Sequence, residues 1–435
     1  MVKVRHLACS LCALILTYSS QAQTPAATPP AITLQDALQR ARSNSVQFQS
    51  AVLAAKIAHE DRVQARAAFL PSVNYTTQYL YTQGNRTLTG VFIANNAVHE
   101  YLSQGNAHEA LNLGPGQIAA YRRSEAVIAL AHAQQEIAAR GLVVTVVQDY
   151  YGLVVAQRKY SDAQRAEAEA ENFLKLSQEL EHGGEVAHSD VIKAQLQLND
   201  RQVALREAQV GLGNARLSLA VLLFPTFNQD FTVVDDLTPP PALPELGEAE
   251  KLAARNNPIL RAALAALAIA KNNVTEAWSA HLPTLTMDYW YGIDADHFST
   301  YTGDVRNLGY SAAATLNIPV WNWGSVQSKV HQAEYQRKQA QLELSAAQRQ
   351  ALADLQSFYN ESEAALAELN TLGSSASLAA ESLRLTTLQY RAGEATALEV
   401  VDAQNLRIQT QNAFADAQAR YRVALATLQT LTGPF

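Results

Sequence analysis

The sequence predicts a mainly α-helical protein with a small β part, built from two tandem repeats that supply long helical hairpins and four antiparallel strands in all. Three observations support this fold class. The composition is 48% hydrophobic and 17% charged, with only 14 prolines in 435 residues, which excludes a disordered chain and favours long helices. The chain also repeats itself. Finally, short segments with period-two alternation precede the longest helical patterns.

The first 22 residues predict a secretory signal peptide. A short basic start precedes the apolar run 7–16, and small residues follow at a cleavage site. The run is too short to span a bilayer. Both cysteines, Cys9 and Cys12, lie inside it, so a processed chain would hold no disulfide and no cysteine metal site. The net charge of −7 disfavours nucleic acid as a partner.

The internal duplication determines the expected domain organisation. A shift of 212 residues places Leu70-Pro71 on Leu282-Pro283, and a shift of 209 places Gly184-Glu185 on Gly393-Glu394. A unit of about 200 residues is too long for a solenoid repeat. The Pro-rich join cannot be helical. After the signal peptide we therefore expect a first repeat, a linker and a second repeat at 23–236, 237–246 and 247–435.

Each repeat is expected to begin with a helix of about 35 residues, at 33–69 and at 248–281, which Pro71 and Pro283 end. Period-two alternation then predicts one β-hairpin per repeat, at about 72–113 and 284–320.

In the first repeat Glu109 interrupts the second strand, at about 99–113, and its register stays open. Polar loops are expected between the strands at 84–100 and 294–308. Strands of about ten residues that are apolar on one side suit a membrane barrel, and a half-buried strand of a soluble sheet is the alternative.

The longest helical patterns follow the hairpins, at 117–181 and 325–392. At ~1.5 Å per residue, 65 residues make a rod of about 97 Å. Each rod ends at a glycine turn and reverses into a helix of about 35 residues, which gives helical hairpins at 117–223 and 325–431. The two shorter helices of a repeat together match the long one, so they should stack end to end beside it. All strands would then lie at one end and both turns at the other.

Several motifs resemble those of the TolC-type outer-membrane efflux factors, across essentially the whole mature chain. They are the Leu-Pro pairs at Leu70 and Leu282, the turn 184–191, and 390–394 (YRAGE) followed by 398–404 (LEVVDAQ). The resemblance implies a homotrimer with a twelve-stranded β-barrel in the outer membrane of a Gram-negative bacterium and an α-helical tunnel across the periplasm. It also implies a periplasmic adaptor (membrane fusion) protein and an inner-membrane pump of the RND or ABC type.

Elementary physics supports an oligomer independently. Four strands cannot close into a barrel, and an open sheet edge in lipid leaves backbone groups unpaired at several kcal/mol each. The smallest useful membrane barrels have ~8 strands, so at least two chains must combine.

The resemblance also implies functional residues at the two turns. The tunnel's periplasmic aperture, or gate, would be formed by Asp190, Tyr390, Glu399 and Asp402, and the adaptor would dock at Gly183, Gly184, Gly393 and Glu394. The best-described family member has an arginine where this chain has Ala395, so its lock cannot be the same. Alternatively, the carboxylates are helix-start residues that the helix dipole stabilises.

Aromatic residues gather around the second hairpin. A membrane-interface girdle is the functional interpretation and ordinary sheet packing the alternative. The residues are Tyr289, Trp290, Tyr291, Tyr310, Trp321 and Trp323. They would contact outer-membrane lipid.

No catalytic constellation emerges from the sequence. His99-Glu100 and His108-Glu109 lack metal-ligand spacing, and the neighbours His188, Ser189 and Asp190 would diverge on a helix start. We therefore expect no enzyme, no catalytic residue, no metal and no cofactor. The sequence favours a passive exit duct for small molecules. The alternatives are the duct of a type I protein-secretion system and a periplasmic coiled-coil scaffold without a pore.

Overall fold

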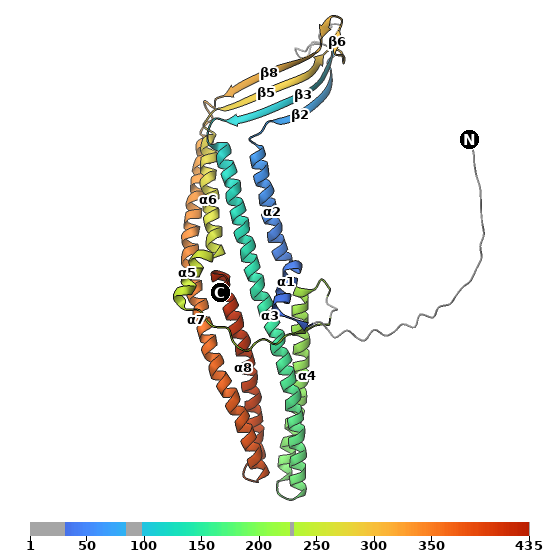
Figure 1. Ribbon diagram of the computed structural model, residues 1–435, viewed down its shortest axis with the longest axis vertical. Helices are drawn as coiled ribbons and strands as arrows, with labels where there is room; N and C mark the ends of the chain where they lie inside the picture. The colour runs from blue at the N-terminus through green and yellow to red at the C-terminus, as the bar shows by residue number, and fades with distance from the viewer. Residues whose placement is uncertain (1–30, 84–97, 227–229, 435) are drawn as a thin grey trace, which may run out of the picture.

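The computed structural model describes residues 31–83, 98–226 and 230–434, so the expected signal peptide lies outside the described residues. The described chain is a long rod with a β-sheet at one end and helical turns at the other (Figure 1). The two repeats lie side by side along the rod.

Two helices of 67 residues each form the spine of the rod, α3 (Gly116–His182) and α7 (Ser325–Arg391). At ~1.5 Å per residue each is about 100 Å long. Shorter helices flank them above and below the middle, as the sequence predicts (Figure 1). Beside the sheet-proximal half lie α2 (Val46–Ala67) and α6 (Pro258–Ser279), and beside the other half lie α4 (His188–Leu223) and α8 (Ala397–Thr432).

The expected first helix of each repeat is in fact two helices. A short helix, α1 (Leu34–Asn44) or α5 (Leu246–Asn256), precedes α2 or α6. Ser45 and Asn257 separate them in an extended conformation, and each side chain accepts a hydrogen bond from the next helix's first turn. Pro258 then starts α6 at a position where its missing N–H costs nothing. Helix periodicity continues through these caps, which is why the break was not predicted.

The sheet has four antiparallel strands in the order β2-β3-β5-β8. They are β2 (Ser72–Tyr81), β3 (His99–Asn112), β5 (Thr284–Ala295) and β8 (Leu308–Asn317). Pairing of Glu109 with Met287 fixes the register of β3 that the sequence left open. The expected loop 294–308 is only partly a loop, because it contains a small hairpin of β6 (Tyr301–Thr302) and β7 (Val305–Arg306).

One face of the sheet is largely apolar and the other polar. Directly opposed residues of antiparallel strands share a face, so the register assigns every strand side chain to one of the two faces of the sheet. The apolar face carries Val73, Tyr75, Tyr79, Leu285, Met287, Tyr289, Tyr291, Ile293, Tyr310 and Leu316. The polar face carries Asn74, Thr76, Gln78, Gln104, Asn106, His108, Asp288, Ser311 and Thr315.

Two extended segments, residues 31–32 and 232–241, cross the middle of the rod, and we call them the belt. Within the belt, β1 (Ala31–Ile32) pairs in parallel with β4 (Thr232–Val233). The fully buried Tyr150 of α3 secures this belt. Its hydroxyl lies 3.1 Å from the carbonyl oxygen of Ile32 and 2.8 Å from that of Val234. Burial raises the pKa of Tyr150 to about 12. Arg158 also binds Asp235 of the belt, at 2.6 Å.

Side by side, the helices form a wall one helix thick. Contacts give the order α2-α3-α6-α7 next to the sheet and α4-α3-α8-α7 toward the turns. The belt covers one side of this wall, where Tyr421 of α8 donates to the carbonyl oxygen of Pro241 at 2.7 Å.

Candidate functional site

Both glycine turns have the same backbone conformation. Gly184 has φ 75° and Gly393 has φ 76°, in the left-handed region that favours glycine. A Cβ at either position would contact nothing within 4 Å, so backbone strain and not space explains these glycines. The neighbouring Gly183 caps α3, and Glu394 is exposed.

Tyr390 joins the two hairpins near their turns. It is only 2% exposed, and its ring centroid lies 5.2 Å from that of Phe173 on α3. Its hydroxyl lies 3.2 Å from the Ser177 hydroxyl. Sequence reasoning placed Tyr390 near the turn but missed both partners, because pairing residues 213 positions apart requires the fold.

The three carboxylates expected at the aperture have different local partners. Glu399 forms a capping box with Thr396, with hydrogen bonds of 3.0 and 3.3 Å that satisfy backbone donors at the start of α8. Asp190 forms an ion pair with Lys193 at 3.0 Å. Asp402 is exposed. The spacing Thr-x-x-Glu could have identified the cap from the sequence alone.

The first turn has a contact that the second lacks. His188 Nδ1 lies 2.7 Å from Glu181 Oε1, across the turn between α3 and α4. At the shift of 209 the equivalents are Ala397 and Tyr390, which cannot form this pair.

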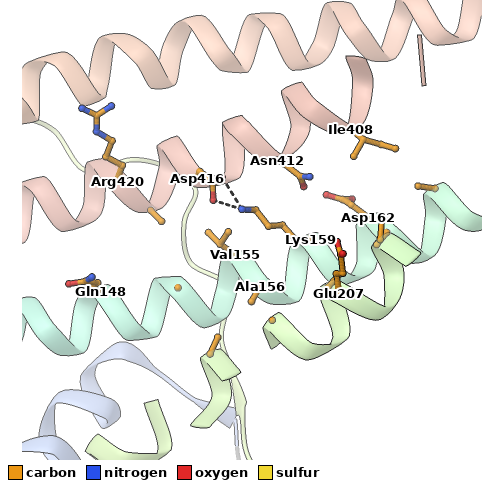
Figure 2. A pocket seen from close by; sticks show the side chains of 18 of the residues that line it. Gln148, Val155, Ala156, Lys159, Asp162, Glu207, Ile408, Asn412, Asp416 and Arg420 are labelled. Atoms are coloured by element: carbon orange, nitrogen blue, oxygen red, sulfur yellow. Dashed lines mark hydrogen bonds and ion pairs between the residues drawn. The ribbon is translucent and has the colours of Figure 1, made fainter. Parts of the chain in front are cut away.

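The wall is hollowed on the side opposite the belt (Figure 2). A hollow of about 680 Å³ has α3 as its floor and α4 and α8 as its sides. Small residues such as Gly152 and Ala156 form the floor. Positions 150 and 158 of α3 contact the belt, whereas 152 and 159 lie roughly 100–180° away from them around the helix axis.

Charged groups line this hollow in pairs. Lys159 reaches across to Asp416 of α8 at 2.7 Å (Figure 2). Arg420 contacts two carboxylates of α7, Glu361 and Glu368. Arg201 lies at the end toward the turns, and partial burial lowers the pKa of its guanidinium. None of these residues was singled out from the sequence, because the hollow needs three helices from both repeats.

The register divides the aromatic residues expected at a membrane interface. Tyr289, Tyr291 and Tyr310 lie on the apolar face, but Trp290 lies on the polar face between Asp288 and Gly292. Trp321 and Trp323 follow β8, are highly exposed, and have ring centroids 5.8 Å apart.

A second aromatic group lies at the end of the apolar face farthest from the helices. Tyr79 packs on Tyr101 with a centroid distance of 5.0 Å, and its hydroxyl lies 2.7 Å from His99 Nδ1. Tyr81 lies beside His99. Only the register of β3 brings these residues together.

The two outer edges of the helical wall expose apolar residues at heptad spacing. On α4 they are Leu196, Val203, Val210 and Leu217, and on α7 they include Leu378 and Leu385. Such stripes normally pack against another helix.

Across the described ranges, no helix is long and apolar enough to cross a membrane. The same ranges contain no group of three or more His, Cys, Asp or Glu residues that could hold a metal ion.

Comparison with known proteins gives consistent matches. The family model described as outer membrane efflux protein matches residues 37–223 and 250–434. The outer membrane protein TolC of Vibrio cholerae is 23% identical over 418 residues, covering 92% of this chain and 90% of that protein. The alkaline protease secretion protein AprF of Pseudomonas aeruginosa is also 23% identical, covering 93% and 85%.

Solved structures show the same fold. The Campylobacter jejuni CmeC outer membrane channel superposes with a TM-score of 0.77 at 16% identity, covering 92% of this chain and 85% of that one. The outer-membrane channel OprN superposes with a TM-score of 0.77 at 19% identity, covering 92% and 89%.

Proposed function

This chain belongs to the outer membrane efflux protein family, and from that premise we propose that three copies form a passive exit duct across the periplasm and outer membrane. The duct serves an efflux system that exports small molecules.

The observation that supports this proposal best is the open sheet. Within the described residues, β2 and β8 each pair with one strand only, although the sheet has an apolar face. In lipid, each unpaired backbone group costs several kcal/mol, so β8 of one copy must pair with β2 of the next. Three four-stranded sheets then close a barrel of twelve strands.

The helical edges support the same closure. The order of the wall places α7 at one edge and α2 and α4 at the other. The exposed apolar stripes of α4 and α7 would meet between copies. In such a ring the belt faces the periplasm, and the hollow around Lys159 and Asp416 faces the lumen.

The mass of the detergent-extracted assembly tests this proposal directly. We expect a trimer of about three times the 47.3 kDa chain mass, reduced by any removed signal peptide, that stays in outer-membrane pellets after urea washing. A monodisperse monomer with intact sheet content would refute the barrel. Release from the pellet by urea would favour a periplasmic scaffold.

At the turns, we propose that threefold symmetry brings Asp190, Glu399 and Asp402 around a narrow aperture and that Tyr390 holds it closed. Carboxylates grouped around an axis repel one another and attract cations, at ~4 kcal/mol per pair at 4 Å and an effective dielectric of 20. The double variant Glu399→Gln, Asp402→Asn is expected to weaken cation preference in planar-bilayer recordings without changing trimer yield. Unchanged selectivity would remove these residues from the aperture.

The partners follow from the same architecture. A duct without an energy source needs a pump in the inner membrane, of the RND or ABC type, and an adaptor between them. We propose that the adaptor docks at the exposed turns around Gly183, Gly184, Gly393 and Glu394. Photo-cross-linking from Glu394 in living cells should capture it. Capture only from positions next to the sheet would place the docking surface elsewhere.

A protein-secretion duct is the second candidate, because a matched relative is named an alkaline protease secretion protein. Deleting the gene separates the two. Efflux predicts greater sensitivity to small toxic compounds with an unchanged set of secreted proteins, and protein secretion predicts the reverse.

A further inference from the structure

One acidic residue lies on the apolar face of the sheet. The register places Glu109 of β3 opposite Met287 of β5, which itself lies opposite Ala314 of β8. All other strand residues of this face in β2, β3, β5 and β8 are uncharged or, for His99, a histidine at the far end. The other acidic strand residues, such as Asp288, lie on the polar face.

Glu109 borders a hollow on the apolar face, next to the helices. The hollow measures about 660 Å³. Small side chains, Ala107, Ala312 and Ala314, and larger apolar residues, Phe69, Leu111, Met287 and Tyr289, line it, and Asp288 from the polar face also contributes to its lining. Its shape and lining suit an acyl chain.

One oxygen of the Glu109 carboxylate lacks a hydrogen-bond partner within the described part of the chain. Its Oε2 is shielded from solvent and forms no hydrogen bond with any described residue. A buried carboxylate oxygen without a donor is costly, and an ionisable group within the membrane points to a functional partner. No lysine or arginine of the four strands shares its face, so the partner must come from outside the sheet.

The position of Glu109 relative to the membrane interface restricts where its partner can come from. Glu109 lies three residues from the helix-proximal end of β3 at Asn112, and the exposed Ile318, Val320, Trp321 and Trp323 lie just beyond the sheet. Indole rings concentrate at the membrane interface. If the helices extend into the periplasm, Glu109 lies where the headgroups of the periplasmic leaflet meet its acyl chains.

We propose that this hollow binds an aminophospholipid of the periplasmic leaflet, with an acyl chain over the three alanines and the headgroup ammonium on the Glu109 carboxylate. An ammonium supplies both the charge and the donors that Oε2 lacks. The inference depends on the proposed outer-membrane duct, which places this face in lipid.

The test measures which lipids remain bound to the intact purified trimer. Wild type and variants are extracted in mild detergent and exchanged into equimolar phosphatidylethanolamine and phosphatidylglycerol with identical chains. Native mass spectrometry then counts the bound lipids. Wild type is expected to retain the ethanolamine lipid preferentially, and Glu109→Gln to reduce that preference by about tenfold or more, as the loss of one charge-assisted hydrogen bond predicts. Equal retention by wild type and Glu109→Gln would overturn the proposal.

Two further variants separate headgroup recognition from chain packing. Glu100→Gln removes a carboxylate from the polar face of the same strand and is expected to leave the preference intact. Ala314→Leu fills the hollow and is expected to lower retention of both lipids. Equal loss of both lipids in Glu109→Gln would mean that Glu109 maintains the hollow and does not recognise a headgroup, which also overturns the proposal.

The same samples report on the proposed function separately. Outer-membrane fractionation and trimer mass are measured before lipid exchange. A chain outside the outer membrane would refute the duct, whereas an outer-membrane trimer without lipid preference would refute only the aminophospholipid site.

Discussion

The turns of the two repeats share a backbone but not the side chains that stabilise them. Gly184 and Gly393 have nearly the same φ, 75° and 76°. At the shift of 209, however, Glu181 becomes the buried Tyr390, and Ala187 becomes the capping residue Thr396. The first turn relies on an exposed His188–Glu181 contact. The second has a capping box and an aromatic contact with the other hairpin.

This difference shows what the duplication preserved. A left-handed glycine is required wherever the hairpin reverses, so both repeats keep it. The remaining positions depend on what each turn packs against. Tyr390 contacts α3 of the first repeat, and this contact links the two hairpins of one chain. The second turn is therefore the one expected to resist opening.

The largest effect is expected from Tyr390→Ala. Removing a buried aromatic ring costs about 3–5 kcal/mol, and here it also breaks the link to Phe173 and Ser177. Hydrogen–deuterium exchange should rise more than a hundredfold in the amides around the second turn, and pore conductance should increase. The matched variant Glu181→Ala alters the equivalent, partly exposed position of the first turn and should change exchange little. Equal effects of the two variants would contradict the comparison.

A second prediction compares equivalent tyrosines at the middle of the rod, Tyr150 and Tyr359. Because burial raises the folded-state pKa of Tyr150 to about 12, stability is fully present below pH 10 and is lost as pH rises from 10 toward 12. The loss reaches about 1.4 kcal/mol per pH unit. We expect Tyr150→Phe to reduce the fall in the trimer's melting temperature between pH 9 and pH 11.5.

Tyr359→Phe is the control for that measurement. Tyr359 is only partly buried, and no described residue forms a hydrogen bond with its hydroxyl. Tyr151 and Tyr421, whose pKa values burial also raises, keep part of the alkaline sensitivity in every variant. A larger change from Tyr359→Phe than from Tyr150→Phe would show that the belt contact does not govern the alkaline response.

Much of this architecture could be predicted from sequence periodicity. Local patterns in segments of about 10 to 70 residues predict the long helices α3 and α7, their glycine turns and strands β2, β5 and β8. The breaks at Ser45 and Asn257 could not be predicted, because a cap interrupts the backbone without interrupting the apolar spacing.

Contacts between distant segments could not be predicted for a different reason: they join residues that are far apart in the sequence. The belt strands β1 and β4 have two residues each and are paired beside the Tyr150 hydroxyl, 118 positions from Ile32. The face of Glu109 depends on pairing with Met287, from the other repeat. Trp290 and Tyr291 are sequence neighbours on opposite faces, as the period-two alternation of this strand predicts.

A third prediction concerns the N-cap residues of α4 and α8. Removing or adding one of these caps should change the stability of its helix start by about 1 kcal/mol. Thr396→Ala removes the capping box of the second turn and is expected to raise amide exchange in the first turn of α8 about fivefold. Ala187→Ser supplies the missing cap in the first repeat, where Asp190 already occupies the position of Glu399, and should slow exchange at the start of α4. Ser189→Ala, outside the cap, should change neither. Faster exchange in Ala187→Ser would show that the first turn cannot adopt the geometry of the second.

The smallest expected effect belongs to the contact unique to the first turn. His188 and Glu181 form an ion pair only when the imidazole is protonated, and the histidine side chain is 73% exposed. Such a pair contributes a few tenths of a kcal/mol at most, and salt screens it. Adding 1 M salt should therefore speed amide exchange at the first turn by less than twofold, after correction for the intrinsic rate. His188→Gln should abolish this response, whereas the second turn, with Ala397 at the equivalent position, should show none in any variant. A salt response of the second turn that equals that of the first would mean that another charge pair acts at both turns, and the His188 contact would then not distinguish them.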